Sequence, residues 1–376
     1  MTREREGFYD RVPYEWRRDV REIGVRKMKK VRWGVIGAGG IARRRTLPGM
    51  RHCRFAQAVA LQDINHSAAR DAAKEFGCRR VFATQEELLA CDEVEAVYIA
   101  TPVHLHASQF IAACRAGKHV LMEKPLAGDA QAARRMIAAA KKAGVYATEG
   151  YMMKFHALHQ KAKGMVDRGE IGKVVFARGQ LSCWYPPIPG AWRQIPKKGG
   201  GGALIDMATH IYDLLEWMVG PIVGVVAFCD RLVHDYPVED SSTTLLHFAG
   251  GAQGVVDCFF NVPDAAGQDR LELYGPLGAI QAAGTIGQMP TGEMFAYLSE
   301  AGKKYDPKQS KDSLAVKSRN VAYKPVNMYG AEVDYLSKCI REKRPPEINT
   351  LEHGLHVLKI ALAAYKSAKT GKVVKV

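Results

Sequence analysis

The chain has 376 residues, 47% of them apolar and 25% charged, which is ordinary for a globular protein long enough to form two domains. No unbroken apolar run reaches the ~18–20 residues of a membrane span, and the charged first 30 residues lack the apolar core of a secretory signal. The net charge of +15 suggests nucleic acid, but lysine and arginine are spread along the chain and no nucleic-acid-binding motif accompanies them.

The eight cysteines are scattered and show neither a C-x-x-C pair nor the spacing of a zinc finger. This usage predicts reduced, mostly buried thiols rather than a disulfide framework. Together with the missing signal sequence, it leads us to expect a cytoplasmic protein with no membrane or nucleic-acid partner and no bound metal.

Residues 1–29 read as a charged extension, and an ordered pattern begins at residue 30. Up to residue 149, apolar runs of strand length alternate with helical stretches. The predicted strands are WGVIGAG, AQAVALQD, AVYIATP and HVLMEKP, and the predicted helices are SAARDAAKEFG, LHASQFIAACRAG and AQAARRMIAAAKKAG. Buried strands that alternate with helices predict a parallel sheet covered on both faces.

Residues 150–376 change character, because longer strands with glycine-containing turns follow one another with few helices between them. This pattern predicts a largely antiparallel sheet. Its main helix is GGGGALIDMATHIYDLLEWMV, and LEHGLHVLKIALAAYKSAKTG forms a final helix. The stretch from Thr285 to Asn327 has weak periodicity, and its structure is left open.

A dinucleotide-binding fingerprint, G-x-G-x-x-A, occurs at Gly37, Gly39 and Ala42, directly after the first strand. Asp63 ends the second strand 21 residues beyond Ala42, where a carboxylate accepts hydrogen bonds from an adenosine ribose and repels a 2′-phosphate. The pattern therefore favours NAD over NADP. Two observations keep alternatives open: Asp63 suits a helix N-cap, and the cluster Arg43–Arg45 suits NADP.

Several blocks of the sequence resemble one enzyme family in their order and spacing. The blocks are GVIGAGGIA, the aspartate after the second strand, ATPVHLH, GKHVLMEKPLA, EGYMMKFH and GGGGALIDMATHIYDLLEW. They are similar to those of the Gfo/Idh/MocA oxidoreductases, which include glucose–fructose oxidoreductase and inositol 2-dehydrogenase. The resemblance spans residues 30–376. It implies an α/β Rossmann domain with a parallel sheet over 30–149, then an α+β domain over 150–376 that binds substrate. The second domain has a large, mainly antiparallel open sheet that serves oligomerisation, which implies a homodimer or homotetramer.

The resemblance also assigns the site residue by residue. The implied catalytic residues are Lys124, Asp206 and His210. The implied cofactor-binding residues are Gly37, Gly39, Gly40, Ile41, Ala42, Asp63, Thr101, Pro102, His104, Glu123 and Lys124. The implied substrate-binding residues are Lys124, Tyr151, His156, Trp192, Arg193, Asp206 and His210. It further implies a cis peptide bond between Lys124 and Pro125.

The residue types at these positions suit hydride-transfer chemistry. A lysine at the carboxyl end of a parallel sheet can stabilise an alkoxide, and a histidine exchanges protons near neutral pH. Asp206, four residues before His210, can hold one tautomer of that histidine or contact the substrate. The alternative interpretations are a solvated surface lysine and a hydrogen-bonded pair on a helix face.

The sequence therefore predicts an NAD-dependent dehydrogenase or reductase that acts on a secondary alcohol or ketone of a sugar, sugar derivative or cyclitol. One alternative is a redox-neutral enzyme that retains NAD and cleaves or epimerises its substrate by transient oxidation. Another is a non-catalytic dinucleotide-binding sensor.

Overall fold

The computed structural model describes residues 29–299 and 316–376, which form two compact units. The first unit holds the chain up to Phe155 together with Val326–Leu358, and the second holds His156–Pro325 together with Lys359–Val376. The predicted extension lies outside the described residues except for Lys29.

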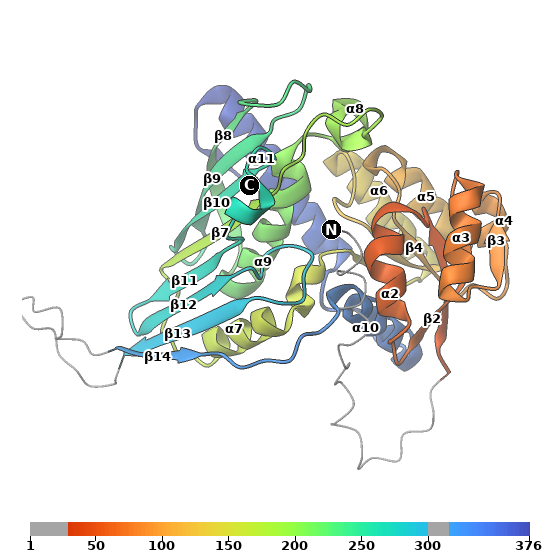
Figure 1. Cartoon of the computed structure of the whole chain (residues 1–376), viewed down its shortest axis with the longest axis horizontal. Coiled ribbons are helices and arrows are strands. Elements are labelled where there is room, and N and C mark those ends of the chain that lie inside the picture. Colours follow the sequence, from red (N-terminus) through yellow and green to blue (C-terminus); the bar gives the residue numbers. More distant parts are fainter. Residues whose placement is uncertain (1–28, 300–315) are drawn as a thin grey trace, which may run out of the picture. The chain divides into compact units, whose positions relative to one another are not determined.

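The first unit is built on a parallel six-stranded sheet (Figure 1). Its strands are β1 (Val31–Ile36), β2 (Ala56–Gln62), β3 (Arg80–Phe82), β4 (Ala96–Ile99), β5 (His119–Met122) and β6 (Ala147–Glu149). Its helices are the π-helical η1 (Ala42–Thr46), α2 (Leu47–Met50), α3 (His66–Phe76), α4 (Gln85–Leu89), α5 (Val103–Arg115), α6 (Ala130–Ala143), the 3₁₀ turn η2 (Met152–Phe155) and α10 (Met328–Glu342).

The strand order β3-β2-β1-β4-β5-β6 is that of a dinucleotide-binding Rossmann domain, and every neighbouring pair in the described sheet is parallel. The order reverses between β1 and β4, so their carboxyl ends flank the position where such sheets bind ligands. The predicted strands and helices of this region are all present. The sequence patterns missed the short β3, α4 and β6.

Helix α10 departs from the expected division of the chain, which assigned all residues from 150 onward to one domain. Its apolar residues Val333, Leu336 and Cys339 join the core of the first unit around Trp33. The indole N–H of Trp33 donates to Ser337 Oγ at 2.9 Å. An amphipathic helix far along the chain therefore completes one face of the Rossmann sheet. The hydrophobic pattern of consecutive residues cannot predict such packing between distant segments.

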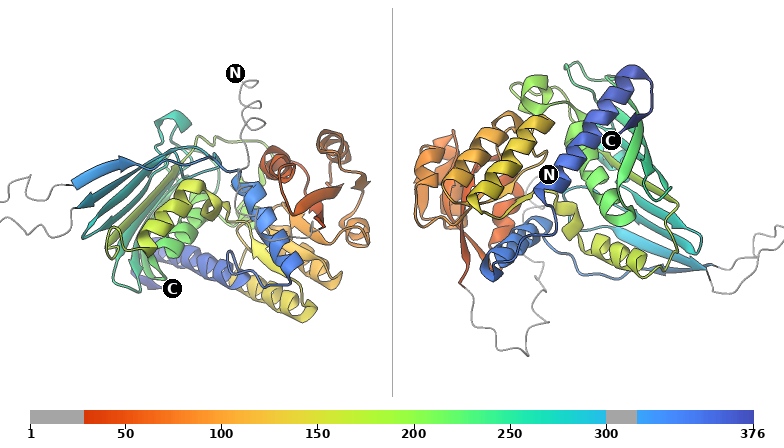
Figure 2. Two further views of the ribbon diagram at one scale, coloured as in Figure 1. Left: turned by 90° about the horizontal axis from the view of Figure 1, so that it is seen from below. Right: turned by 180° about the vertical axis from the view of Figure 1, so that it is seen from behind.

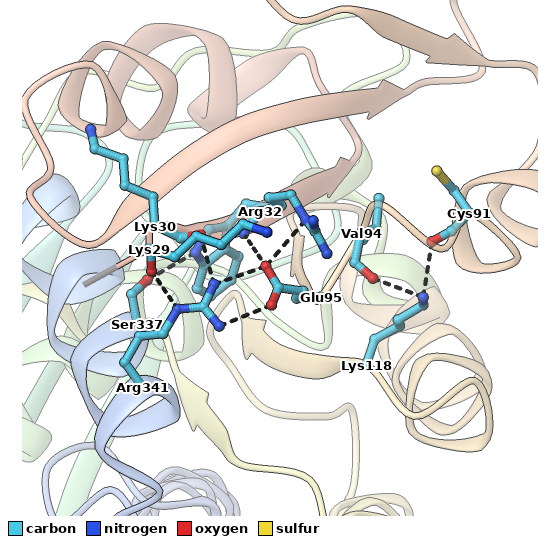
Figure 3. Close-up of polar contacts among 10 residues, drawn as sticks. Lys29, Lys30, Arg32, Cys91, Val94, Glu95, Lys118, Ser337 and Arg341 are labelled. Carbon is cyan, nitrogen blue, oxygen red and sulfur yellow. Dashed lines mark hydrogen bonds and ion pairs between the residues drawn. The ribbon is translucent and has the colours of Figure 1, made fainter. Parts of the chain in front are cut away.

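An arginine of α10 ties this helix to the amino end of β1 (Figure 3). Arg341 contacts Glu95 through two parallel N–H···O bonds of 2.9 Å, and it donates to the backbone oxygens of Lys29 and Lys30. Arg32 also donates its backbone N–H to Glu95 at 3.0 Å. Burial raises the pKa of the Glu95 carboxyl, but the hydrogen bonds and charges of both arginines outweigh burial and leave that pKa below its usual value.

We expect Arg341→Ala to lower the free energy of unfolding at pH 7 by about 1–2 kcal/mol, because a bidentate, partly buried ion pair is lost. A carboxyl group with a lowered pKa stabilises the fold above its unfolded pKa, and that contribution is lost as the pH falls through its folded pKa. Denaturant titrations should therefore show the deficit of the variant shrinking below about pH 4. Arg344→Ala is the control, since Arg344 pairs with the exposed Glu347 on the same segment. Equal losses of unfolding free energy in the two variants would contradict a stabilising role for the Arg341–Glu95 ion pair.

The second unit carries a nine-stranded sheet in the order β14-β13-β12-β11-β7-β10-β9-β8-β15. The strands are β7 (Phe176–Ser182), β8 (Ile222–Asp230), β9 (Ser241–Phe248), β10 (Gln253–Phe259), β11 (Leu271–Gly275), β12 (Gly278–Ala283), β13 (Glu293–Ser299), β14 (Val316–Asn320) and β15 (Val374–Lys375). The helical elements are α7 (Ala157–Asp167), η3 (Trp192–Gln194), α8 (Pro196–Gly199), the π-helical η4 (Leu204–Ala208), α9 (Thr209–Val219) and η5 (Asp264–Ala266). Helix α11 (Leu351–Thr370) is divided between the units at Leu358.

Among the described strands of this sheet, β7 and β10 pair in parallel and the other neighbours pair antiparallel. The sheet is therefore mainly antiparallel, as the sequence predicts. Helices α7 and α9 and the end of α11 cover one face of the sheet (Figure 2). The other face carries exposed apolar side chains, among them Phe228, 70% exposed, and Leu245, 52% exposed. The region with weak periodicity contributes β13 and the edge strand β14.

The eight cysteines are free thiols, five of them buried and three partly exposed, as the sequence predicts. Within the part of the chain that the structure describes, no helix is long and apolar enough to cross a membrane. In the same residues, no cluster of three or more His, Cys, Asp or Glu side chains has an arrangement suited to a metal ion.

Candidate active site

The fingerprint turn joins β1 to the helix that begins the first crossover. Gly37 has φ +83°, and a Cβ at this position would lie 2.9 Å from the backbone oxygen of Ala100, so only glycine fits. Ala42 is fully buried against the sheet, in agreement with the predicted need for a small residue. Ile41 directly precedes this buried position at the start of η1. A Cβ on Gly40 would meet no protein atom within 4 Å, so this side of the turn is open to a ligand.

Asp63 lies at the carboxyl end of β2 and is bonded to the fingerprint turn itself. Its Oδ2 accepts the backbone N–H of Gly39 at 3.0 Å, and its Oδ1 accepts that of Asn65 at 2.9 Å. The N-cap of α3 is Asn65, whose side chain accepts the N–H of Ala68 at 3.1 Å. The N-cap alternative for Asp63 is therefore wrong. The partly exposed Asp63 carboxylate suits the hydroxyl groups of a ribose, and the open glycine turn beside it suits the pyrophosphate of a dinucleotide.

The arginine cluster that favours NADP forms the π-helical η1 directly after this turn. Arg43 pairs with Glu75 of α3 through Nε and Oε2 at 2.9 Å, and both side chains are largely exposed. Its charge is thus partly neutralised by a neighbour.

The turns after β4 and β5 carry the remaining residues assigned to the cofactor. Thr101 Oγ1 donates to Gln109, Pro102 is the N-cap residue of α5, and His104 is exposed on the first turn of that helix. Glu123 accepts the Tyr98 hydroxyl at 2.5 Å through Oε1 and the backbone N–H of Lys124 at 3.2 Å through Oε2. The Lys124–Pro125 peptide bond is cis, as predicted.

One residue of this region, His106, was missed in the sequence and is fully buried. Its ring nitrogens lie within hydrogen-bonding distance of the backbone oxygens of Thr101 and Pro125. A signal was available, because Val103, His106 and Phe110 recur at helical spacing on the buried face of α5. A histidine at such a position needs polar partners inside the protein.

In the second unit, Gly199, Gly201 and Gly202 of the glycine run pack against protein atoms, whereas Gly200 has φ +86° and no atom within 4 Å of a Cβ. A Cβ on Gly201 would lie 1.9 Å from Tyr365 Oη, and one on Gly202 would lie 1.9 Å from the backbone oxygen of Glu239. Close packing within the unit thus accounts for Gly201 and Gly202 without a ligand.

Glu239 holds the start of the helix that follows the glycine run. Its Oε1 accepts the N–H groups of Gly202 at 2.9 Å and Leu204 at 3.1 Å, and the hydroxyl of Tyr365 at 2.7 Å. The backbone oxygen of Glu239 also accepts the N–H of Ala203 at 3.0 Å. Burial raises the pKa of the Glu239 carboxyl, although these hydrogen bonds oppose the effect. A carboxylate distant in sequence therefore does the work of a helix cap.

Asp206 lies in η4 and His210 in the first turn of α9, so a π-helical segment changes the simple spacing that the sequence suggested. Asp206 Oδ1 accepts Arg193 Nε at 3.0 Å, in a half-buried ion pair. Arg193 also stacks over the ring of Trp192, with 4.3 Å between the guanidinium carbon and the ring centroid. Arg193, which the resemblance assigns to substrate, thus contacts both Trp192 and Asp206. His210 is 8% exposed.

Tyr151 and His156, which the resemblance assigns to substrate, are both buried. His156 is the N-cap of α7, where its Nδ1 accepts the backbone N–H of Leu158 at 3.2 Å. Burial lowers the pKa of His156 to about 4, so the ring is neutral at pH 7.

Residues 31–151 match an oxidoreductase family with an NAD-binding Rossmann fold, and residues 159–281 match the GFO/IDH/MocA C-terminal domain. A 1,5-anhydro-D-fructose reductase of Ensifer adhaerens is 28% identical over 347 residues, which cover 92% of this chain and 98% of that protein. A trans-1,2-dihydrobenzene-1,2-diol dehydrogenase of Mus musculus is 30% identical over 245 residues, or 63% of this chain and 71% of that one. The crystal structure of an aldose-aldose oxidoreductase from Caulobacter crescentus, complexed with glycerol, aligns with a TM-score of 0.82. Its sequence is 27% identical, and the match covers 93% of this chain and 100% of that chain. Sequence motifs, fold and relatives agree, and the chain belongs to the Gfo/Idh/MocA family of oxidoreductases.

Proposed function

We propose that this oxidoreductase is an NAD-dependent dehydrogenase that oxidises a secondary alcohol of a sugar, sugar derivative or cyclitol, or reduces the matching ketone. The observation that carries the proposal is the open fingerprint turn, whose Gly39 N–H is bonded to Asp63. The names of the relatives, a reductase of an anhydro sugar and a diol dehydrogenase, support a small polyhydroxy substrate.

Within this proposal, each side chain has a task set by its chemistry. Lys124 donates a hydrogen bond to the reacting oxygen and stabilises it as an alkoxide, and His210 takes or returns the hydroxyl proton. Asp206 pairs with Arg193, and its carboxylate oxygens accept hydrogen bonds, which suits it to bind a substrate hydroxyl or orient His210. The nicotinamide, when bound, supplies the acceptor or donor of the hydride.

The exposed apolar side chains on the uncovered face of the second sheet support self-association through that face. They are consistent with the expected homodimer or homotetramer.

Asp63 should decide the choice of cofactor. We expect the wild type to prefer NAD over NADP. Asp63→Ser should lower the ratio of kcat/KM with NAD to kcat/KM with NADP, because the carboxylate that repels a 2′-phosphate is removed. Asp63→Asn should do the same while keeping an acceptor for the Gly39 N–H, so it separates charge from loop structure. The measurement is kcat/KM with each cofactor. A wild type that uses both equally would contradict the assignment and direct attention to Arg43–Arg45.

The proposal as a whole is tested by a panel of sugars and cyclitols, followed at 340 nm with NAD and NADP separately. Activity on a secondary alcohol or ketone in the panel, with net formation or consumption of reduced cofactor, is the expected result. Binding of NAD with no turnover on any member would favour a sensor instead.

A further inference from the structure

The ring of His106 lies between two turns that the proposed function assigns to the cofactor and to the chemistry. Nε2 lies 2.9 Å from the backbone oxygen of Thr101, and Nδ1 lies 3.0 Å from that of Pro125. Thr101 follows β4 and Pro125 follows β5, and these strands are neighbours in the sheet. One buried side chain therefore spans the carboxyl ends of both strands.

The backbone around Lys124 is held on both sides by polar groups of the first unit. On its amino side, the Tyr98 hydroxyl contacts Glu123, and the same carboxylate accepts the Lys124 N–H. On its carboxyl side, the Pro125 carbonyl faces His106. A lysine side chain is long and flexible, so the direction in which it leaves the turn depends on how firmly the backbone is held.

The protonation state of the ring makes its two contacts unequal at any moment. Burial lowers the pKa of His106 to about 4, although backbone carbonyls around the ring oppose this, so the ring is neutral at pH 7. A neutral imidazole has a single N–H and donates to one carbonyl at a time. An N–H on Nδ1 donates to the Pro125 carbonyl, and an N–H on Nε2 donates to the Thr101 carbonyl.

We propose that His106 is a positioning residue that donates its single N–H in turn to two carbonyls, from Nδ1 to the Lys124 turn at Pro125 and from Nε2 to the cofactor-binding turn at Thr101. The inference rests on the proposed function, which gives Lys124 and Thr101 their roles. It differs from a space-filling role, because a ring that only fills the core would affect stability and would not separate catalysis from cofactor binding.

Three substitutions of His106 distinguish the effect of the Nδ1 contact from the effect of the Nε2 contact. The amide nitrogen of asparagine can take the place of Nδ1, and that of glutamine can take the place of Nε2, whereas leucine fills the space without a donor. His106→Asn should keep kcat within about twofold of the wild type and weaken NADH binding about fivefold to tenfold. His106→Gln should keep the NADH affinity and lower kcat about fivefold to tenfold. His106→Leu should show both losses.

NADH affinity is read from fluorescence without substrate, so it does not depend on turnover, and melting temperatures are recorded for every variant. The control is His119→Gln, at the opposite end of β5, where the ring stacks on Tyr146 with 5.3 Å between centroids and Nδ1 accepts the Tyr146 N–H. It should change stability without changing kcat or NADH affinity.

The inference is overturned if the Asn and Gln variants lose kcat and affinity in the same proportion, or if His106→Leu matches the wild type in both. Because Asn and Gln differ by one methylene, their comparison stands even if the leucine variant does not fold. Failure of the proposed function looks different, since the wild type would then show no cofactor-linked turnover or Lys124→Ala would be fully active.

Discussion

Replacing Lys124 or His210 with alanine is expected to lower kcat by about two or more orders of magnitude, which is the usual contribution of a positioned acid–base group. NAD affinity should stay near that of the wild type, because the fingerprint turn and Asp63 are untouched. Steady-state kinetics on a substrate identified by the panel gives kcat, and fluorescence titration with NADH gives the affinity.

Lys142→Ala and His52→Ala are matched controls, since both residues are exposed and lie in α6 and in the turn after α2. They should behave like the wild type. A Lys124→Ala or His210→Ala variant that keeps more than a tenth of the wild-type kcat would contradict the assigned roles.

The same assay distinguishes net oxidoreduction from a redox-neutral reaction. A dehydrogenase releases one NADH for each alcohol oxidised, which appears as a steady rise at 340 nm. Product formation with no net NADH, by a protein purified with its dinucleotide, would replace the proposed reaction while leaving the residue assignments in place.

Gly202→Ala is expected to be severely destabilising. The added Cβ would lie 1.9 Å from the backbone oxygen of Glu239, and backbone cannot move away as the end of a flexible side chain can. The strain should cost about 2–3 kcal/mol and lower the unfolding temperature by roughly 5–10 °C. Because Asp206 and His210 follow on the same helix, kcat should fall even below the unfolding temperature.

Gly224→Ala in β8 is the control from the same unit, since its Cβ would meet no atom closer than 3.8 Å. It should change the unfolding temperature little, and it should leave kcat unchanged. If Gly202→Ala melts like the wild type, the start of this helix is not held by Glu239 as described.

Much of the first unit was predictable because its signals are local. A buried strand, a glycine turn and a helix are read from consecutive residues, and Gly37 and Ala42 satisfy steric demands within a single turn. Asp63 belongs to the same local set, and its bond to Gly39 agrees with the fingerprint. Helix-period and strand-period patterns likewise placed the main helix and most strands of the second sheet.

The remaining features depend on residues that the sequence separates widely. Cys339 and its neighbours on α10 return to the core around Trp33, and Glu239 reaches the glycine run from 37 residues away. The Arg193–Asp206 pair and the two contacts of His106 arise only when loops and strand ends meet in three dimensions. The order of residues along the chain thus determined the elements and the cofactor turn, because these follow from local geometry. Only the tertiary structure decided which buried polar groups hold the functional residues, because hydrogen bonds between distant segments leave no periodic trace in the sequence.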